Sequence, residues 1–166
     1  MLVRMLRALK LDSSVYEEVE HDKSATGQAM AVVVLVSLLG SIGQLFGAGG
    51  LKFVLFAAAS SLVGWCLMAV VSLGIGKLLG GKSDIGELLR ALGFAYTPQV
   101  FGIIPFIGVI LAFVLGVIAW VQALRAALDI STGKAILTAF LSIVAFIMVM
   151  IPLGILLGLG SALTGG

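Results

Sequence analysis

Charged side chains are scarce in this chain. They make up 11% of its 166 residues, against about 25% in soluble domains, whereas hydrophobic residues make up 61%. A chain of this size has too little interior to hide so many apolar side chains from water. The composition therefore excludes a soluble monomer.

Cysteine and histidine each occur once, as Cys66 and His21. A single cysteine cannot form an intramolecular disulfide or a thiolate cluster, and a single histidine cannot supply the histidine pair of a zinc site. Ionisable residues are also missing from the cores of the apolar runs, so no buried carboxylate pair is available for catalysis or proton transport. The sequence predicts a non-enzymatic protein with no cofactor and no metal.

Long apolar segments are what the chain has in abundance. A helix needs about 20 apolar residues to cross a hydrocarbon core of about 30 Å, and five segments can be fitted to that length after an amphipathic and acidic region at residues 1–27. We expect an all-α polytopic membrane protein with five transmembrane helices. The expected spans are 28–46, 53–76, 88–104, 106–124 and 135–157.

The third of these spans is the least regular. Asp84 and Glu87 have the spacing of a capping box, which predicts the start of a helix. We expect that helix to enter the membrane near Leu88, with Arg90 reaching the lipid headgroups and with a kink near Pro98. Pro105 then indicates a tight turn that makes the third and fourth spans a hairpin.

The basic residues predict the orientation of these spans. With the N-terminus in the cytoplasm, nine of the ten Lys and Arg residues lie inside and only Lys52 lies outside. A rival path that fuses 101–124 into one span lowers the ratio to seven against three, so the five-span path is favoured. The sequence thus predicts an integral membrane protein with its N-terminus in the cytoplasm and its C-terminus outside. The nine are Arg4, Arg7, Lys10, Lys23, Lys77, Lys82, Arg90, Arg125 and Lys134.

Two short helices are expected before the first span. Met1–Leu11 has the pattern of a basic amphipathic helix on an anionic membrane surface. Ser14–Asp22 reads as a second helix, whose acidic residues are either solvated or docked against arginines of later loops. Glu17 and Glu18 are the candidates for docking.

Residues 76–83 match the pattern of a phosphate-binding loop letter for letter. That motif works where it joins a β-strand to a helix in a water-filled site, whereas here it follows a membrane span. The glycines and lysines are better explained as a helix end at the membrane interface. We therefore expect no nucleotide, and the small net charge of +2 indicates no nucleic acid.

Polar residues at the inner ends of the third and fourth spans form the candidate site. The hairpin would bring Arg90, Tyr96 and Pro98 near one polar face of the fourth span. That face is formed by Gln122, Arg125 and Asp129, which are three and four residues apart. A ligand or partner site is one interpretation, and anchoring at the interface with an Arg125–Asp129 pair is the other. The full candidate set is Glu17, Glu18, Arg90, Tyr96, Pro98, Gln122, Arg125 and Asp129.

Two segments carry a family resemblance. Leu88–Pro98 reads LLRALGFAYTP, and Trp120 is followed by ALRAALDISTGKA over 123–135. With its five spans and the short acidic helix before them, the chain resembles the YIP-domain family, the Ypt/Rab-GTPase-interacting membrane proteins, in its prokaryotic form. The resemblance implies a protein of the prokaryotic cytoplasmic membrane without an agreed biochemical activity. Eukaryotic members have a long cytosolic N-terminal region with an Asp-Leu-Tyr-Gly-Pro type motif, which this sequence lacks, so Rab binding is not carried over.

The sequence thus favours a membrane-organising or protein-interaction module that works on its cytoplasmic face. Its expected partners are the lipid bilayer, a membrane or cytosolic protein, and possible further copies of itself. Reversing Arg90 or Arg125 to Glu is expected to abolish partner binding and to leave the protein folded. The alternative function is a small passive transporter or channel subunit, suggested by the proline in the third span and by hydroxyl groups such as those of Thr138 and Ser142.

Overall fold

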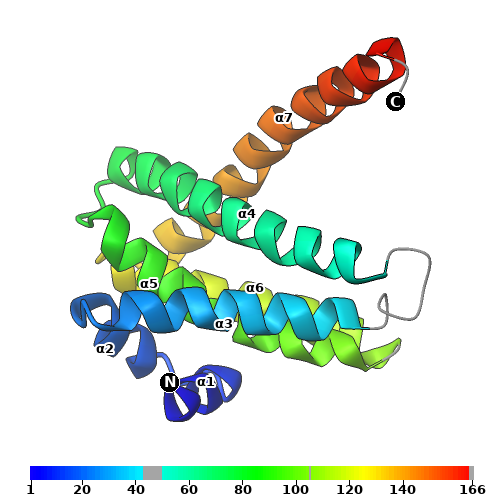
Figure 1. Cartoon of the computed structure of the whole chain (residues 1–166). Coiled ribbons are helices and arrows are strands. Elements are labelled where there is room, and N and C mark those ends of the chain that lie inside the picture. The colour runs from blue at the N-terminus through cyan, green and yellow to red at the C-terminus, as the bar shows by residue number, and fades with distance from the viewer. Residues whose placement is uncertain (43–49, 105, 165–166) are drawn as a thin grey trace.

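A computed structural model describes residues 1–42, 50–104 and 106–164 of the chain (Figure 1). Within those ranges the chain folds into helices and contains no β-strand, which confirms the expected all-α class. The helices are α1 (Leu2–Leu9), α2 (Ser14–His21), α3 (Ala25–Ser41), α4 (Gly50–Leu78), α5 (Ile85–Ala95), the 3₁₀ helix η2 (Thr97–Ile103), α6 (Ile107–Ala127) and α7 (Thr132–Thr164).

Three helices in the described part of the chain are long and apolar enough to cross a membrane. They are α4, α6 and the Thr132–Pro152 part of α7, and they correspond to the expected second, fourth and fifth spans. The first expected span corresponds to α3, which is apolar but shorter, and residues 43–46 of that span lie outside the described residues. The third corresponds to α5 followed by η2.

The segment expected as the third span begins with the predicted capping box. The backbone N–H of Glu87 donates to Asp84 Oδ1 at 2.9 Å, and the backbone N–H of Asp84 donates to Glu87 Oε2 at 3.0 Å. These bonds satisfy two amides that have no partner within the helix, so α5 starts at Ile85, ahead of the expected membrane entry at Leu88.

The expected kink takes a different form from a bent α-helix. The α-helix ends at Ala95, and the chain continues as a 3₁₀ helix with Pro98 in its first turn, where a missing N–H costs least. The expected turn residue Pro105 lies outside the described residues. The hairpin itself is present, since α6 packs along both α5 and η2.

The helix α5 lies among α3, α4 and α6 and packs against all three (Figure 1). Its approach to α3 is close because Gly93 faces Ala29, and a Cβ at Gly93 would lie 2.6 Å from the Ala29 Cβ. The helix α7 packs on α4 and α6 near its start, and its C-terminal part extends away from the other helices (Figure 1).

Large side chains that are fully buried gather where α2 meets α5 and α6. Val15, Tyr16 and Val19 of α2 pack in the same core as residues of α5 and of the end of α6. On α7 beyond residue 146, the side chains that the structure describes are those of 147–152 and 155, and they are exposed. Several of the largest fully buried side chains therefore lie around the short helix α2, close to the acidic candidates of that helix.

Candidate functional site

Arg90 of α5 fixes the end of α2. Its side chain is 6% exposed, and its Nε donates to the backbone carbonyls of Val19 at 3.1 Å and Glu20 at 2.9 Å. Its Nη2 also donates to the Glu20 carbonyl, and its Nη1 lies 3.5 Å from Thr26 Oγ1. The guanidinium thus satisfies carbonyls at the end of α2 that have no partner in the helix.

The expectation that Arg90 reaches the lipid headgroups is therefore wrong. The physical reason is that helix-end carbonyls of α2, 70 residues away in the chain, offer a buried cation fixed acceptors. Reversing Arg90 to Glu would set a carboxylate against those carbonyl oxygens, so we no longer expect that variant to stay folded.

A polar pocket of about 350 Å³ opens beside this contact, between α2 and the end of α6. Three carboxylates face one arginine and one histidine in it. We call it the polar pocket, and its lining residues are Glu17, Glu20, His21, Arg125, Ala126, Asp129 and Ile130.

Arg125 and Glu17 face each other across the mouth of the polar pocket. Arg125 Nη2 lies 3.7 Å from Glu17 Oε1, and the two side chains are 45% and 58% exposed. An exposed pair at that distance contributes little to stability, so both groups are available to another molecule. Among the described residues Arg125 pairs with Glu17 and not with Asp129, which was the pair expected for simple interface anchoring.

Glu20 is the buried carboxyl of the polar pocket. Its side chain is 6% exposed, its Oε1 lies 3.3 Å from His21 Nδ1, and its Oε2 has no hydrogen-bond partner in the described part of the chain. Burial raises the Glu20 pKa to about 7, and the nearby charges of Asp129 and Glu87 add to the effect, while His21 opposes it. The Glu20 carboxyl group thus changes from its protonated to its ionised form near neutral pH.

His21 is exposed at the rim of the same pocket. Its Nδ1 lies 3.0 Å from the Glu17 carbonyl oxygen, and this hydrogen bond together with the Glu20 charge raises the His21 pKa. No group of three or more His, Cys, Asp and Glu residues with the geometry of a metal site occurs in the described ranges.

Glu18 belongs to a separate ion-pair network that attaches α1 to α2. Arg4 Nε donates to Glu18 Oε1 at 2.8 Å, Arg4 Nη2 donates to Asp22 Oδ2 at 2.8 Å, and Arg7 Nη1 donates to Glu18 Oε2. Arg7 Nε donates to Asp12 Oδ2 at 2.9 Å, which with the Ser14 hydrogen bonds lowers the Asp12 pKa to about 2.

Those pairs change the interpretation of α1. Its arginines were expected to meet anionic lipid, but they contact carboxylates of its own chain. The exposed face of the helix is apolar and is formed by Leu2, Val3 and Leu6. The helix thus offers a membrane surface its apolar side chains, not its arginines.

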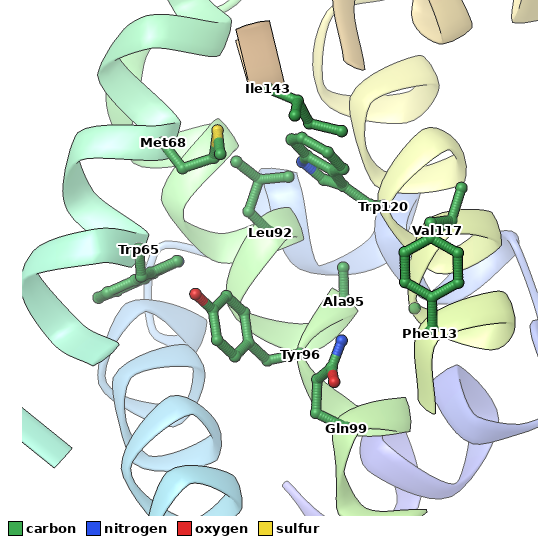
Figure 2. Close-up of a pocket in the computed structure, with 11 residues that line it drawn as sticks. Trp65, Met68, Leu92, Ala95, Tyr96, Gln99, Phe113, Val117, Trp120 and Ile143 are labelled. Carbon is green, nitrogen blue, oxygen red and sulfur yellow. The ribbon is translucent and has the colours of Figure 1, made fainter. Parts of the chain in front are cut away.

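Tyr96 lies in a second cavity, the aromatic pocket, with a volume of about 450 Å³ (Figure 2). Figure 2 shows Trp65 and Met68 of α4 on one side, Phe113, Val117 and Trp120 of α6 on the other, and Tyr96 and Gln99 between them. The other lining residues are Leu92, Ala95, Gly116 and Ile143.

The candidate set therefore divides. Glu17, Arg125 and Asp129 share the polar pocket, whereas Tyr96 lines the aromatic pocket. Pro98 is buried in η2. Gln122 lines neither pocket, and its Oε1 is a buried acceptor without a partner among the described residues.

Sequence reasoning missed Glu20 as a site residue. Glu20 looks like its acidic neighbours in the sequence, and only its i, i+4 relation to Tyr16 on the buried face of α2 could have singled it out. Gln99 stands beside Pro98 at the predicted kink, but its setting depends on α6, where the absence of a Cβ at Gly116 leaves room for its amide.

The segment that matches a phosphate-binding loop uses its amides within the protein. The N–H of Gly80 donates to Lys77, the N–H of Gly81 to Gly76 at 2.9 Å, and the N–H of Lys82 to the Leu128 carbonyl at 2.9 Å. Gly80 has a φ of +88°, as expected just after a helix end. These contacts connect the end of α4 to the turn between α6 and α7. The N–H groups of Gly80, Gly81 and Lys82 are therefore not available to bind a phosphate.

Comparison with known proteins gives one family. The family model described as the Yip1 domain matches residues 11–153. No curated protein and no solved structure matches the chain.

Proposed function

This chain belongs to the Yip1-domain family, and on that premise we propose that it is a non-enzymatic integral membrane protein that organises membranes or binds other proteins through a cytoplasmic face. The observation that carries the proposal is the polar pocket, in which Arg125 and Glu17 are exposed beside a buried carboxyl.

The proposed membrane topology has five crossings. Three are α4, α6 and α7, and the others are α3 and the combined α5–η2 segment. Eleven α-helical and seven 3₁₀ residues span about 30 Å together, which matches a hydrocarbon core. The excess of basic residues at the ends that adjoin α2 supports a cytoplasmic polar pocket.

The domain division that we propose follows this topology. Residues 1–27 form a cytoplasmic segment that docks on the membrane domain of residues 28–166. Arg90 supports this division, because it holds the end of α2 against α5 through backbone carbonyls. Arg90 is thus a positioning residue, and Glu17, Arg125 and Asp129 are the residues that can meet a partner.

Charge indicates which side chain the partner presents. Glu17, Glu20 and Asp129 carry three carboxyl groups into the polar pocket against Arg125 and a histidine. A Lys or Arg side chain of the partner could donate to the Glu17 and Asp129 carboxylates, and its positive charge would favour the ionised form of Glu20. A basic segment of a membrane or cytosolic protein is therefore the proposed partner.

The test is a pull-down of the full-length protein from native membranes in mild detergent, analysed by mass spectrometry. Asp129→Lys and Arg125→Glu change the charge of the pocket mouth without touching the buried core. Lys82→Glu is the matched control, because it reverses an exposed charge outside the pocket. The proposal expects a stoichiometric partner that Asp129→Lys loses, because the new lysine repels a basic segment. Arg125→Glu and the control should retain the partner, which revises the loss that the sequence predicted for Arg125→Glu. Recovery of the same proteins with all three variants would refute it.

A passive transporter or channel subunit is the second candidate. It is favoured by the change from α to 3₁₀ helix at Tyr96, beside a cavity within the membrane helices. Against it, Ser142 is buried in a hydrogen bond with Ser72 at 3.2 Å, and Thr138 donates to the Lys134 carbonyl, so these hydroxyls serve packing. Solute flux into liposomes that contain only this protein would support transport.

A further inference from the structure

The aromatic pocket lies among the membrane helices and not at the polar pocket. Its walls come from α4, α5, η2, α6 and α7, and its volume of about 450 Å³ lies within the usual range of small-molecule sites. Both tryptophans of the chain, Trp65 and Trp120, line it. The proposed protein-binding face has no role in this cavity, so the inference below is independent of it.

Polar groups of this pocket lack partners. The Tyr96 hydroxyl, the Gln99 side-chain amide and the Trp120 indole N–H make no side-chain hydrogen bond within the described ranges. Trp65 differs, because its indole N–H donates to the Leu89 carbonyl at 3.1 Å. Figure 2 shows the Tyr96 hydroxyl and the Gln99 amide among the apolar lining.

All three groups can donate a hydrogen bond. Donors within a membrane cost free energy when they lack an acceptor, so this arrangement favours a ligand whose polar group accepts hydrogen bonds. Because the rest of the lining is apolar, the remainder of the ligand must be apolar as well.

The depth of the donors matches one chemical group of the bilayer. Trp120 lies five residues before Arg125 on α6, which is about 7–8 Å along the helix. If Arg125 lies among the headgroups, Trp120 lies at the border where headgroups give way to acyl chains. The ester carbonyls of glycerolipids lie at that border, and they can accept hydrogen bonds but cannot donate them.

The pocket is open on the side that faces the bilayer. Phe113, Val117 and Ile143 line it and are 69%, 40% and 38% exposed. A chain that enters past these residues reaches Ala95 and Leu92, which are buried at its floor. An acyl chain can thus reach the cavity from the bilayer without crossing water.

We propose that the aromatic pocket binds one acyl chain of a glycerolipid from the adjoining leaflet, with the ester carbonyl of that chain accepting hydrogen bonds from Tyr96 and from one of the neighbouring donors, Gln99 or Trp120. The four aromatic rings contact the first part of the chain, and the donors fix its depth. The lipid is then a resident ligand that joins α4 to α6.

Brominated lipid tests the proposal directly, because bromine on an acyl chain quenches a tryptophan that it touches. The full-length protein in detergent is titrated with dibrominated dioleoyl phosphatidylethanolamine, and tryptophan emission is followed. We expect quenching that saturates near one lipid per protein. The conservative variant Tyr96→Phe is expected to weaken binding about fivefold, as for the loss of one hydrogen bond.

Further variants and a second lipid separate the parts of the proposal. Ala95→Phe fills the floor of the pocket and should remove the saturable quenching, whereas Phe56→Leu, at an exposed site of α4 outside the pocket, should leave it unchanged. An ether-linked lipid with the same chains and headgroup lacks the carbonyl and should bind more weakly than the ester.

Three results would overturn the proposal. The first is quenching that never saturates, and the second is equal quenching in Ala95→Phe and the unaltered protein. The third is equal binding of the ester and ether lipids together with unchanged lipid binding by Tyr96→Phe. Native mass spectrometry of each variant provides a second count of bound lipid, and circular dichroism shows whether Ala95→Phe is folded.

Discussion

The two ends of the helix bundle are held together by different means. At the end near α2, a buried arginine and fully buried side chains connect α2, α5 and α6. At the other end, the C-terminal part of α7 leaves its neighbours and exposes apolar side chains (Figure 1). The first end is packed like a water-soluble core, whereas the second depends on lipid for its contacts.

That difference indicates where specificity can reside. Polar groups with fixed partners define one arrangement of α2, α5 and α6, and a pocket between such elements keeps its shape. A helix that only lipid surrounds has no such constraint. Interaction with a particular partner is therefore expected at the α2 end, and the predictions below test whether the two ends differ as described.

Removing the buried arginine should have the largest effect. Arg90→Leu leaves the Val19 and Glu20 carbonyls without a donor and frees the end of α2, so we expect a loss of about 3–5 kcal/mol in the free energy of unfolding. Thermal unfolding in detergent, followed by circular dichroism, measures it. The matched variant Arg125→Leu removes an exposed arginine and should cost less than about 1 kcal/mol. Equal losses in the two variants would contradict the comparison.

Glu20 should make the α2 end sensitive to pH. Its pKa is about 7 in the folded protein against an ordinary value of 4.5, so between these values the folded state holds a proton that the unfolded chain has released. Stability contributed by this group therefore falls as the pH rises through that window and stays low above it.

Glu20→Gln should abolish this pH dependence. The variant is expected to match the unaltered protein near pH 4.5 and to exceed it above pH 7, by up to about 3 kcal/mol. Chemical unfolding at the two pH values measures the difference. Glu17→Gln, at an exposed neighbour, is the control and should leave the profile unchanged. If the stability difference between Glu20→Gln and the unaltered protein is the same at both pH values, Glu20 does not cause the pH dependence.

The close contact of α5 with α3 should tolerate no added methyl group. Gly93→Ala would bring its Cβ to 2.6 Å from the Ala29 Cβ and 3.0 Å from the Ala29 Cα, so the helices must separate, at a cost of about 1–3 kcal/mol. Gly27→Ala is the control on α3, because a Cβ there meets nothing within 4 Å and alanine favours the helix. Melting temperatures that fall for both variants alike would show that the contact is looser than described.

The smallest effect is expected at the lipid-facing end. Met148 and Val149 on α7 are 69% and 61% exposed, so Met148→Leu and Val149→Ile should change the free energy of unfolding in detergent by less than about 0.5 kcal/mol. A larger loss in either variant would mean that this part of α7 packs against protein.

Much of the fold could be predicted from local signals. The capping box at Asp84 and Glu87 fixes the start of α5, and apolar length indicates α4, α6 and α7 to within a few residues, except at the far end of α7. The confirmed helical class and the Yip1 family follow from the same signals, since both depend on pattern along the chain.

What could not be predicted depends on contacts between distant residues. Arg90 was expected to reach lipid because nothing in the sequence links it to carbonyls 70 residues away. Tyr96 was grouped with Arg125 because both lie on the predicted hairpin, but the aromatic residue sits deeper, beside Trp120. A single sequence gives the order of such groups along each helix and not their partners across helices.

The central claim is that partners meet the α2 end of the molecule and not the lipid-facing end. A photo-crosslinking amino acid in place of His21, which is exposed at the rim of the polar pocket, and in a second protein in place of Met148, tests it in native membranes. The account predicts a protein adduct from position 21 and only lipid adducts from position 148. A protein adduct from position 148, with none from position 21, would contradict it.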